Sequence, residues 1–155
     1  MVSTDFEWQW SAFGALTPAA LYAVLAARSA VFVVEQACAY QDLDGYDAHA
    51  DHLVAWRDGE VAAYCRVFAP GVKYAEASIG RVLTSAAFRR TGVGRQLVAR
   101  ALAQLDARHP GRGARISAQA YLERFYASFG FETVSAPYLE DGIPHVEMLR
   151  AGRPG

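Results

Sequence analysis

The sequence is most informative at one glycine-containing segment, Arg89-Arg90-Thr91-Gly92-Val93-Gly94. The segment stands between an apolar run over 77–85, typical of a strand, and a pattern typical of a helix over 91–108. The first turn of a helix has backbone N–H groups without intrahelical partners and carries the positive end of the helix dipole. Glycines let a phosphate approach those groups closely, and the arginines add positive charge. The segment therefore predicts a pyrophosphate site.

Three nucleotide-binding loops compete for this segment. A P-loop requires Gly, four residues and then Gly-Lys-Ser/Thr, and that pattern is absent. The dinucleotide fingerprint of nicotinamide enzymes requires a third glycine where this chain has Leu97. The pattern Arg/Gln-x-x-Gly-x-Gly/Ala fits in full. Gly-x-Gly before a helix also arises as simple turn chemistry, so the segment alone leaves a structural role open.

The elements around this segment alternate between strands and helices. Thr17-Pro18 predicts a helix start, Asp58-Gly59 a hairpin turn, and Gly130 the residue just past a helix. We expect strands near 6–10, 52–56, 61–68, 77–85, 114–119, 131–134 and 146–149, and helices from 17, over 91–108 and over 121–129. This order predicts a mixed α/β fold, α+β in character, in which helices cover both faces of a mixed sheet.

Length and composition indicate one folded domain. The chain has 155 residues, of which 53% are hydrophobic and 20% charged, enough apolar residues to bury a core. We find no linker or repeat, so we expect a single domain over 1–155, with a frayed tail over 151–155.

Charge and targeting signals point to a cytoplasmic protein. The net charge of -1 gives no electrostatic case for a nucleic acid or an anionic membrane as partner. The N-terminus has no signal-peptide pattern, and no 18-residue apolar run is uninterrupted. Cys38 and Cys65 do not suggest a disulfide framework. We therefore expect cytoplasmic residence, with no nucleic-acid or membrane partner.

Further strings make the chain resemble a known family. The string AQAYLERFYASFGF over 118–131 accompanies the glycine segment, and more specific strings lie at 31–36, 44–47, 79–82 and 140–145. Together they resemble the GNAT superfamily of N-acetyltransferases, and in particular its ElaA-like branch. One departure is visible: Arg90 and Thr91 stand where the family often has Gly-Arg or Gly-Lys.

The resemblance implies a central, mostly antiparallel sheet and acetyl-coenzyme A (acetyl-CoA) as co-substrate. It assigns the polarisation of the thioester to backbone N–H groups around Val82–Thr84, and the pyrophosphate to the glycine segment. The cofactor-binding residues expected from it are Val82, Leu83, Thr84, Arg89, Arg90, Thr91, Gly92, Val93, Gly94, Arg95 and Gln119.

Tyr126 is the expected general acid, because it matches the family tyrosine and a phenol of pKa about 10 can protonate a thiolate. The alternative is a core tyrosine, although Tyr121, Phe125 and Phe129 fit that packing role better. The general base stays open: Glu35 is either that base or a structural residue. The candidate substrate-binding residues are Arg28, Glu35, His52, Glu140, Asp141 and His145.

The acidic residues and histidines leave alternatives open. Asp42, Asp44, Asp47 and Asp51 could be a solvated loop, or they could flank a cleft with the Glu140-Asp141 turn and favour a cationic acceptor. His49 and His52 lie near two of these acids, but the sequence does not indicate the third and fourth ligands that a metal site needs, so we expect no metal.

The leading hypothesis is an N-acetyltransferase that moves an acetyl group from acetyl-CoA to a primary amine by direct attack in a ternary complex. No feature singles out either cysteine as a nucleophile. The acceptor is a small-molecule or peptide amine, and the protein is a monomer or homodimer. The alternative is a non-catalytic acyl-CoA-binding sensor or partner module.

Overall fold

The computed structural model describes residues 5–153. These residues fall into two compact units: residues up to 67 and from 81 to 101 form the first, and residues 68–80 and those from 102 onward form the second. The chain enters each unit twice, so no single cut of the sequence separates them.

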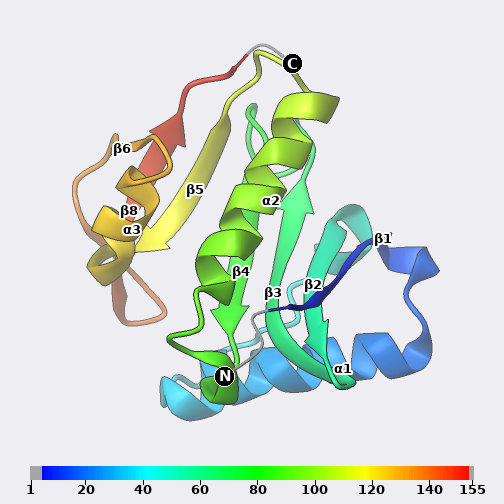
Figure 1. Cartoon of the computed structure of the whole chain (residues 1–155). Coiled ribbons are helices and arrows are strands. Elements are labelled where there is room, and N and C mark those ends of the chain that lie inside the picture. The colour runs from blue at the N-terminus through cyan, green and yellow to red at the C-terminus, as the bar shows by residue number, and fades with distance from the viewer. Residues whose placement is uncertain (1–4, 154–155) are drawn as a thin grey trace. The chain divides into compact units, whose positions relative to one another are not determined.

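The first unit contains most of a four-stranded sheet of order β1-β2-β3-β4 (Figure 1). Its strands are β1 (Glu7–Ala12), β2 (Asp51–Arg57), β3 (Glu60–Phe68) and β4 (Ser78–Thr84). β2 pairs antiparallel with both β1 and β3. The β2–β3 turn has φ of 51° at Asp58 and 77° at Gly59, the left-handed values that an Asp-Gly hairpin requires, so the predicted hairpin is confirmed.

Helix α1 (Pro18–Arg28) packs on one face of this sheet. The Thr17 hydroxyl caps it by accepting a hydrogen bond from the Ala20 N–H at 3.1 Å, as predicted. The helix continues as the π-helical segment η2 (Ser29–Glu35). Val24 and Phe32 from these two segments join a core cluster with Val54, Val61, Tyr64 and Leu83 of the sheet.

Helix α2 (Val93–Arg108) covers the opposite face. The Arg100 guanidinium lies 4.4 Å from the centre of the Trp8 ring on β1. The next residue on β1, Gln9, lines a pocket together with residues of α1. Successive side chains of a strand point to opposite faces, so Trp8 with α2 and Gln9 with α1 lie on opposite faces of the sheet. Helices therefore cover both faces, as predicted. The predicted apolar stripe of α2 is buried in full: Val93, Leu97, Val98, Ala101, Leu102 and Leu105.

The second unit contains an antiparallel sheet of β5 (Ala114–Gln119), β6 (Phe131–Thr133), β7 (Tyr138–Glu140) and β8 (Ile143–Arg150). Strand β8 pairs with the other three. The short helix α3 (Glu123–Ala127) follows the 3₁₀ turn η5 (Ala120–Leu122), and Gly130 has the expected positive φ, 96°. The remaining 3₁₀ turns are η1 (Phe13–Ala15), η3 (Asp47–His49) and η4 (Ala86–Phe88).

The β7–β8 hairpin was not predicted. Its turn is Asp141-Gly142, with φ of 51° and 77°, the same conformation as Asp58-Gly59. The signal was therefore present in the sequence. Pro144 lies just inside β8 and donates no backbone hydrogen bond, which weakens the strand pattern there.

Residues 151–153, which belong to the expected frayed tail, contact the turn that follows α2. The Gly111 N–H donates to the Arg153 carbonyl at 2.9 Å. A Cβ on Gly152 would overlap the Gly111 carbonyl group, so the two backbones are in close contact. Residues 154 and 155 of the predicted tail lie outside the described residues.

One helical stretch, Pro18–Glu35, is long and apolar enough to cross a membrane, with a mean hydropathy of 1.5. Length and composition are the only grounds for that assignment, and the core helix of a folded domain meets the same criteria. In this structure Val24 and Phe32 pack into the core, and Arg28 is buried against two aspartates. The stretch therefore packs on the sheet along one side, and 17% of it is buried.

The core of α2 gives a direct test of the fold. Leu97 is 0% exposed, so Leu97→Ala should lower the free energy of unfolding by about 2–5 kcal/mol through lost contacts and a residual cavity. Gln104→Ala on the exposed side of the same helix should change it by less than about 0.5 kcal/mol. Urea unfolding of both variants would check this, and similar losses in both would contradict the assigned helix face.

Candidate functional site

The predicted glycine segment forms the loop that joins the end of β4 to the start of α2 (Figure 1). Its backbone turns through left-handed conformations at Arg90 (φ 65°) and Gly92 (φ 85°). The Thr91 hydroxyl donates to the Phe88 carbonyl at 2.5 Å and accepts from the Val93 N–H at 3.3 Å. These bonds fix the loop just before the helix, so the first-turn N–H groups open onto it.

Gly94 brings the first turn of α2 against the end of β4. A Cβ at this position would lie 2.9 Å from the Thr84 hydroxyl oxygen, closer than side-chain carbons normally approach. The second glycine of the motif therefore has a steric reason that the sequence does not reveal. The end of β4 and the start of α2 therefore meet within one unit. A cofactor that lies along β4 and places its phosphates at the start of α2 would require this arrangement.

Glu35 and Arg89 form an exposed ion pair next to the loop. The Arg89 Nη2 lies 2.6 Å from the Glu35 Oε2, and the Arg89 Nε donates to the Thr84 carbonyl at 3.3 Å. Both side chains are exposed by more than a third, so solvent screens the pair and its stabilisation is small. The contact supports the structural role for Glu35, and its alternative role as base stays a prediction.

Strand β4 changes conformation at Arg81, just before the residues Val82–Thr84 that the resemblance assigns to the cofactor. Arg81 has φ of 51°, a left-handed value that is uncommon for a non-glycine residue inside a strand. Its side chain is anchored: Nε donates to Asp42 Oδ1 at 2.8 Å, and Nη2 donates to the Asp42 carbonyl at 3.0 Å. The surroundings thereby hold a backbone conformation that costs energy.

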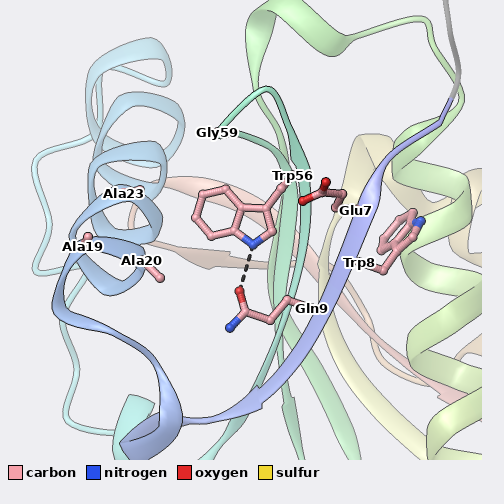
Figure 2. Close-up of a pocket in the computed structure, with 8 residues that line it drawn as sticks. All are labelled: Glu7, Trp8, Gln9, Ala19, Ala20, Ala23, Trp56 and Gly59. Carbon is pink, nitrogen blue, oxygen red and sulfur yellow. Dashed lines mark hydrogen bonds between the residues drawn. The ribbon is translucent and has the colours of Figure 1, made fainter.

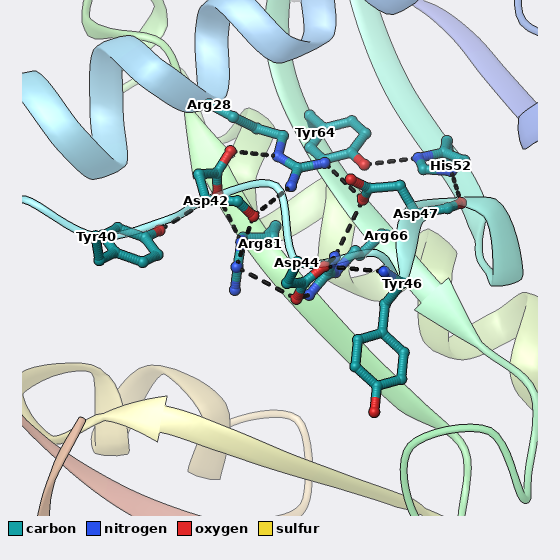
Figure 3. A network of polar contacts seen from close by, with 10 residues as sticks. All are labelled: Arg28, Tyr40, Asp42, Asp44, Tyr46, Asp47, His52, Tyr64, Arg66 and Arg81. Atoms are coloured by element: carbon teal, nitrogen blue, oxygen red, sulfur yellow. Dashed lines mark hydrogen bonds and ion pairs between the residues drawn. The ribbon is translucent and has the colours of Figure 1, made fainter. Parts of the chain in front are cut away.

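Asp42 belongs to a larger ionic cluster, which we define as Arg28, Arg66 and Arg81 with Asp42, Asp44 and Asp47 (Figure 3). Arg28 is 1% exposed and contacts both Asp42, at 3.0 Å, and Asp47, at 2.7 Å. Arg28 therefore has two aspartate partners inside the protein. Its hydrogen bonds are made within the protein, which argues against the predicted substrate-binding role.

Mutual pairing keeps the cluster charged. Burial opposes ionisation of Asp47, but hydrogen bonds from Arg28 and Arg66 hold the pKa of that carboxyl below its usual value. Burial also opposes ionisation of Asp44, whose pKa the Arg66 hydrogen bond lowers. The expectation of a solvated acidic loop is therefore wrong for Asp42, Asp44 and Asp47, because their charges are neutralised by arginines.

His52 is part of the same buried region and not a surface base. It is 1% exposed, its Nε2 donates to the Asp47 carbonyl at 2.9 Å, and its Nδ1 accepts from the Tyr64 hydroxyl at 2.6 Å (Figure 3). Burial lowers the pKa of His52, so the neutral ring is favoured. Both nitrogens are engaged within the protein, which favours a structural role for His52 and argues against the predicted substrate-binding role.

In the second unit, Tyr126 of α3 is 6% exposed and packs edge-on against Phe131 at 5.9 Å and Phe125 at 5.2 Å. Tyr121, which we expected in the core, is 75% exposed. A buried phenol can serve as an acid only where its hydroxyl reaches the reacting atoms, and the assignment of Tyr126 stays a prediction.

The other predicted residues of this unit lie near one another at the ends of β5, β7 and β8. Gln119 is the register partner of His145 on β8. The His145 Nε2 lies 3.3 Å from the Glu140 Oε2. Asp141 lies in the β7–β8 turn. The structure thus brings together the three acceptor-side residues predicted from the C-terminal region.

Comparison with known proteins assigns the family. The profile of the acetyltransferase (GNAT) domain matches residues 18–150. The chain belongs to the GNAT acetyltransferase family. It is 43% identical to protein ElaA of Escherichia coli over 146 residues, which cover 93% of this chain and 95% of that protein.

Solved structures of GNAT relatives agree with this fold. A crystal structure of an acyl-CoA N-acyltransferase from Pseudomonas aeruginosa matches with a TM-score of 0.91 and 43% identity, covering 95% of this chain and 100% of that one. The crystal structure of Escherichia coli ElaA matches with a TM-score of 0.88 and 41% identity, covering 94% and 99%. The predicted fold class and the ElaA-like resemblance are confirmed, and the GNAT family supports acyl transfer from an acyl-CoA to nitrogen as the class of reaction.

Sequence reasoning missed several residues of the ionic cluster and of the second sheet. Arg66 lies within the apolar run of β3, where a charge indicates a buried partner. Arg81 was quoted only as part of a family string. Tyr138, whose ring stacks on His145 at 6.1 Å, had no signal, because its strand was not predicted.

A separate pocket of about 460 Å³ lies in the first unit between α1 and strands β1 and β2 (Figure 2). The Trp56 indole N–H donates to the Gln9 side-chain oxygen across it at 2.9 Å. No predicted GNAT site residue lines this pocket, so it carries none of the assignments above. Among residues 5–153, no group of three or more histidine, cysteine, aspartate or glutamate side chains is arranged to hold a metal ion.

The ionic cluster predicts a pH-dependent stability. Asp47→Asn should lower the free energy of unfolding by about 3 kcal/mol at pH 7, since it leaves Arg28 and Arg66 buried beside a neutral amide. The folded-state pKa of Asp47 is lowered, so its stabilisation is present above the unfolded pKa of about 3.9 and is lost as the pH falls through the folded-state pKa. The gap between variant and parent should therefore shrink in acid.

Urea unfolding at pH 7 and at pH 3 would measure this difference. The control is Asp58→Asn in the β2–β3 turn, where asparagine tolerates the left-handed backbone and little change is expected. A pH-independent gap for Asp47→Asn would show that its charge does not stabilise the fold.

Proposed function

We propose that this protein is an N-acetyltransferase that transfers an acetyl group from acetyl-CoA to a primary amine by direct attack in a ternary complex. One observation carries the proposal: in a chain that the GNAT family profile matches over residues 18–150, the Arg89–Gly94 loop joins the end of β4 to the first turn of α2. That junction supplies main-chain donors for a diphosphate next to a strand for the thioester arm.

The first unit would hold the cofactor mainly through its backbone. In the proposal, N–H groups of Gly92–Arg95 bind the pyrophosphate, and Arg90 and Arg95 add charge. Main-chain groups of Val82, Leu83 and Thr84 align the pantetheine arm and polarise the thioester carbonyl. Arg89 would join the phosphate contacts by exchanging its solvent-screened pair with Glu35.

The chemistry requires a neutral amine and a protonated leaving group. The amine nitrogen attacks the thioester carbonyl, the new C–N bond forms, and the C–S bond breaks. Tyr126 is proposed to give its phenolic proton to the leaving thiolate, while a base accepts the proton from the amine. Gln119, at the end of β5 before η5 and α3, is proposed to contact the cofactor.

The acceptor is proposed to be a small-molecule or peptide amine. A cationic preference now rests on Glu140 and Asp141, since arginines neutralise Asp42, Asp44 and Asp47. Acetyl as the acyl group, cytoplasmic residence, the absence of metal, nucleic-acid and membrane partners, and a monomeric or homodimeric state stay predictions.

Cofactor binding is the first test of the proposal. Calorimetry with the purified chain should detect acetyl-CoA binding, and Gly94→Val should weaken it at least tenfold, or about 1.4 kcal/mol. The reason is steric, because even a Cβ there would lie 2.9 Å from the Thr84 hydroxyl. Ala99→Val on the exposed side of α2 is the matched control and should bind normally. No heat and no affinity in the folded parent would refute the function.

The proposed acid makes a kinetic prediction. Tyr126→Phe should lower kcat on the order of 100-fold and leave acetyl-CoA affinity nearly unchanged, because it removes a proton and keeps the ring in its apolar contacts. Release of coenzyme A with a panel of primary amines, including polyamines and lysine peptides, gives the rates. Unchanged turnover would remove Tyr126 from the mechanism. Binding without release for any amine would favour the sensor alternative.

A further inference from the structure

One face of the second sheet is polar, and the other forms the core. Ile116 and Ala118 of β5 and Val146 and Met148 of β8 are buried on the core face. The residues between them point the other way, because side chains alternate along a strand. That polar face is formed by Ser117, Gln119, Tyr138, Glu140, His145 and Glu147, which the antiparallel register places side by side.

The backbone fixes which nitrogen of the neutral His145 ring carries the hydrogen. The His145 Nδ1 lies 2.7 Å from the Ile143 carbonyl oxygen, and a carbonyl can only accept a hydrogen bond. Nδ1 therefore carries the hydrogen. In the neutral ring the lone pair is then on Nε2, the nitrogen that faces the Glu140 carboxylate at 3.3 Å. Stacking on Tyr138, whose hydroxyl bonds Ser117 at 2.5 Å, holds the ring in this orientation.

When the ring is neutral, its Nε2 and the Glu140 carboxylate present two acceptors to each other; when the ring is protonated, the two groups form an ion pair. The pair with a neutral ring is completed by a group that brings at least two N–H hydrogens and a positive charge. A primary ammonium meets this requirement, since it can donate one hydrogen to each acceptor. The Glu140 side chain is 51% exposed and that of His145 is 8% exposed, so the pair is accessible to solvent mainly at Glu140.

We propose that Glu140 and His145 Nε2 form the binding site for the ammonium of the acceptor, and that His145 is the general base. The inference rests on the proposed function, which it deepens by naming the acceptor class as a primary ammonium. One N–H proton moves from the ammonium to Nε2, which leaves a neutral amine and an imidazolium paired with Glu140. The location fits, because the register partner of His145 is Gln119, a predicted cofactor contact.

Among the carboxylates on this sheet face, Glu140 is the one proposed to bind the ammonium, because Glu147 is paired with an arginine. Glu147, two residues along β8, lies 3.4 Å from Arg115, which also pairs with Glu76. The phenols of Tyr74 and Tyr138 face the same region, and burial raises the pKa of each, so both stay neutral donors or acceptors. Glu147 is therefore the matched control: it lies on the same sheet face but is neutralised by an arginine.

The first test does not require knowledge of the natural acceptor. Long-range proton–nitrogen NMR of the four imidazoles, with His145 assigned by its loss in His145→Gln, should show the Nδ1–H form of the neutral ring. Added propylammonium should shift the His145 signals in the parent and in Glu147→Gln but not in Glu140→Gln. An Nε2–H ring, or no propylammonium shift in the parent, would overturn the proposal.

The second test uses turnover with an amine that the parent acetylates. His145→Gln should lower kcat on the order of 100-fold and remove the fall in rate at low pH, while the KM for acetyl-CoA stays constant. Glu140→Gln should raise the KM for the amine, and Glu147→Gln should leave it unchanged. A purely structural role would lower the thermal midpoint without altering the pH profile, and that result would also overturn the proposal.

These outcomes are separable from failure of the proposed function. If acetyl-CoA binds and amines are acetylated while His145→Gln keeps the parental pH profile, only the base assignment fails. If acetyl-CoA does not bind, the function itself fails, although the NMR results would still decide whether the pair binds an ammonium.

Discussion

The first unit depends on the pairing of charges that are withdrawn from water. Arg28 of α1 and Arg66 of β3 are nearly fully buried, and neither charge is tolerable there without a partner. Three aspartates of the loop over 38–50 supply those partners, and Asp42 also holds Arg81 of β4. The cluster therefore ties a helix, two strands and an irregular loop to one another at a single point.

This pairing reaches the proposed cofactor strand through the backbone. Arg81 adopts a left-handed conformation inside β4, and its two hydrogen bonds to Asp42 offset the cost of that conformation. The residues that follow, Val82–Thr84, are those proposed to meet the thioester arm. The same strand then ends against Gly94, where the absence of a side chain lets α2 begin next to Thr84. The buried ion pairs and the absence of a Cβ at Gly94 together position the loop.

Much of the fold could be predicted because its signals are local. The Thr17 cap, the Asp58-Gly59 turn and the apolar stripe of α2 each lie within a few residues, and each is present as expected. The β7–β8 hairpin escaped prediction although Asp141-Gly142 carries the same turn signal, since Pro144 and the short β7 weaken the pattern around it. The contact of the tail with Gly111 was not predicted, because it is made by backbone groups, which composition does not report.

The sequence by itself determined the family, the placement of the glycine loop before a helix, and the segments near Tyr126 and His145. The family and these segments follow from motif strings that resemble a known family, and the placement of the loop follows from local periodicity and turn chemistry. Only the tertiary structure decided that Asp42, Asp44 and Asp47 are neutralised by arginines, that both nitrogens of His52 are engaged, and that His145 Nε2 faces Glu140. The reason is physical: a charge acquires its role from partners that are distant along the chain, and only folding brings those partners within hydrogen-bonding distance.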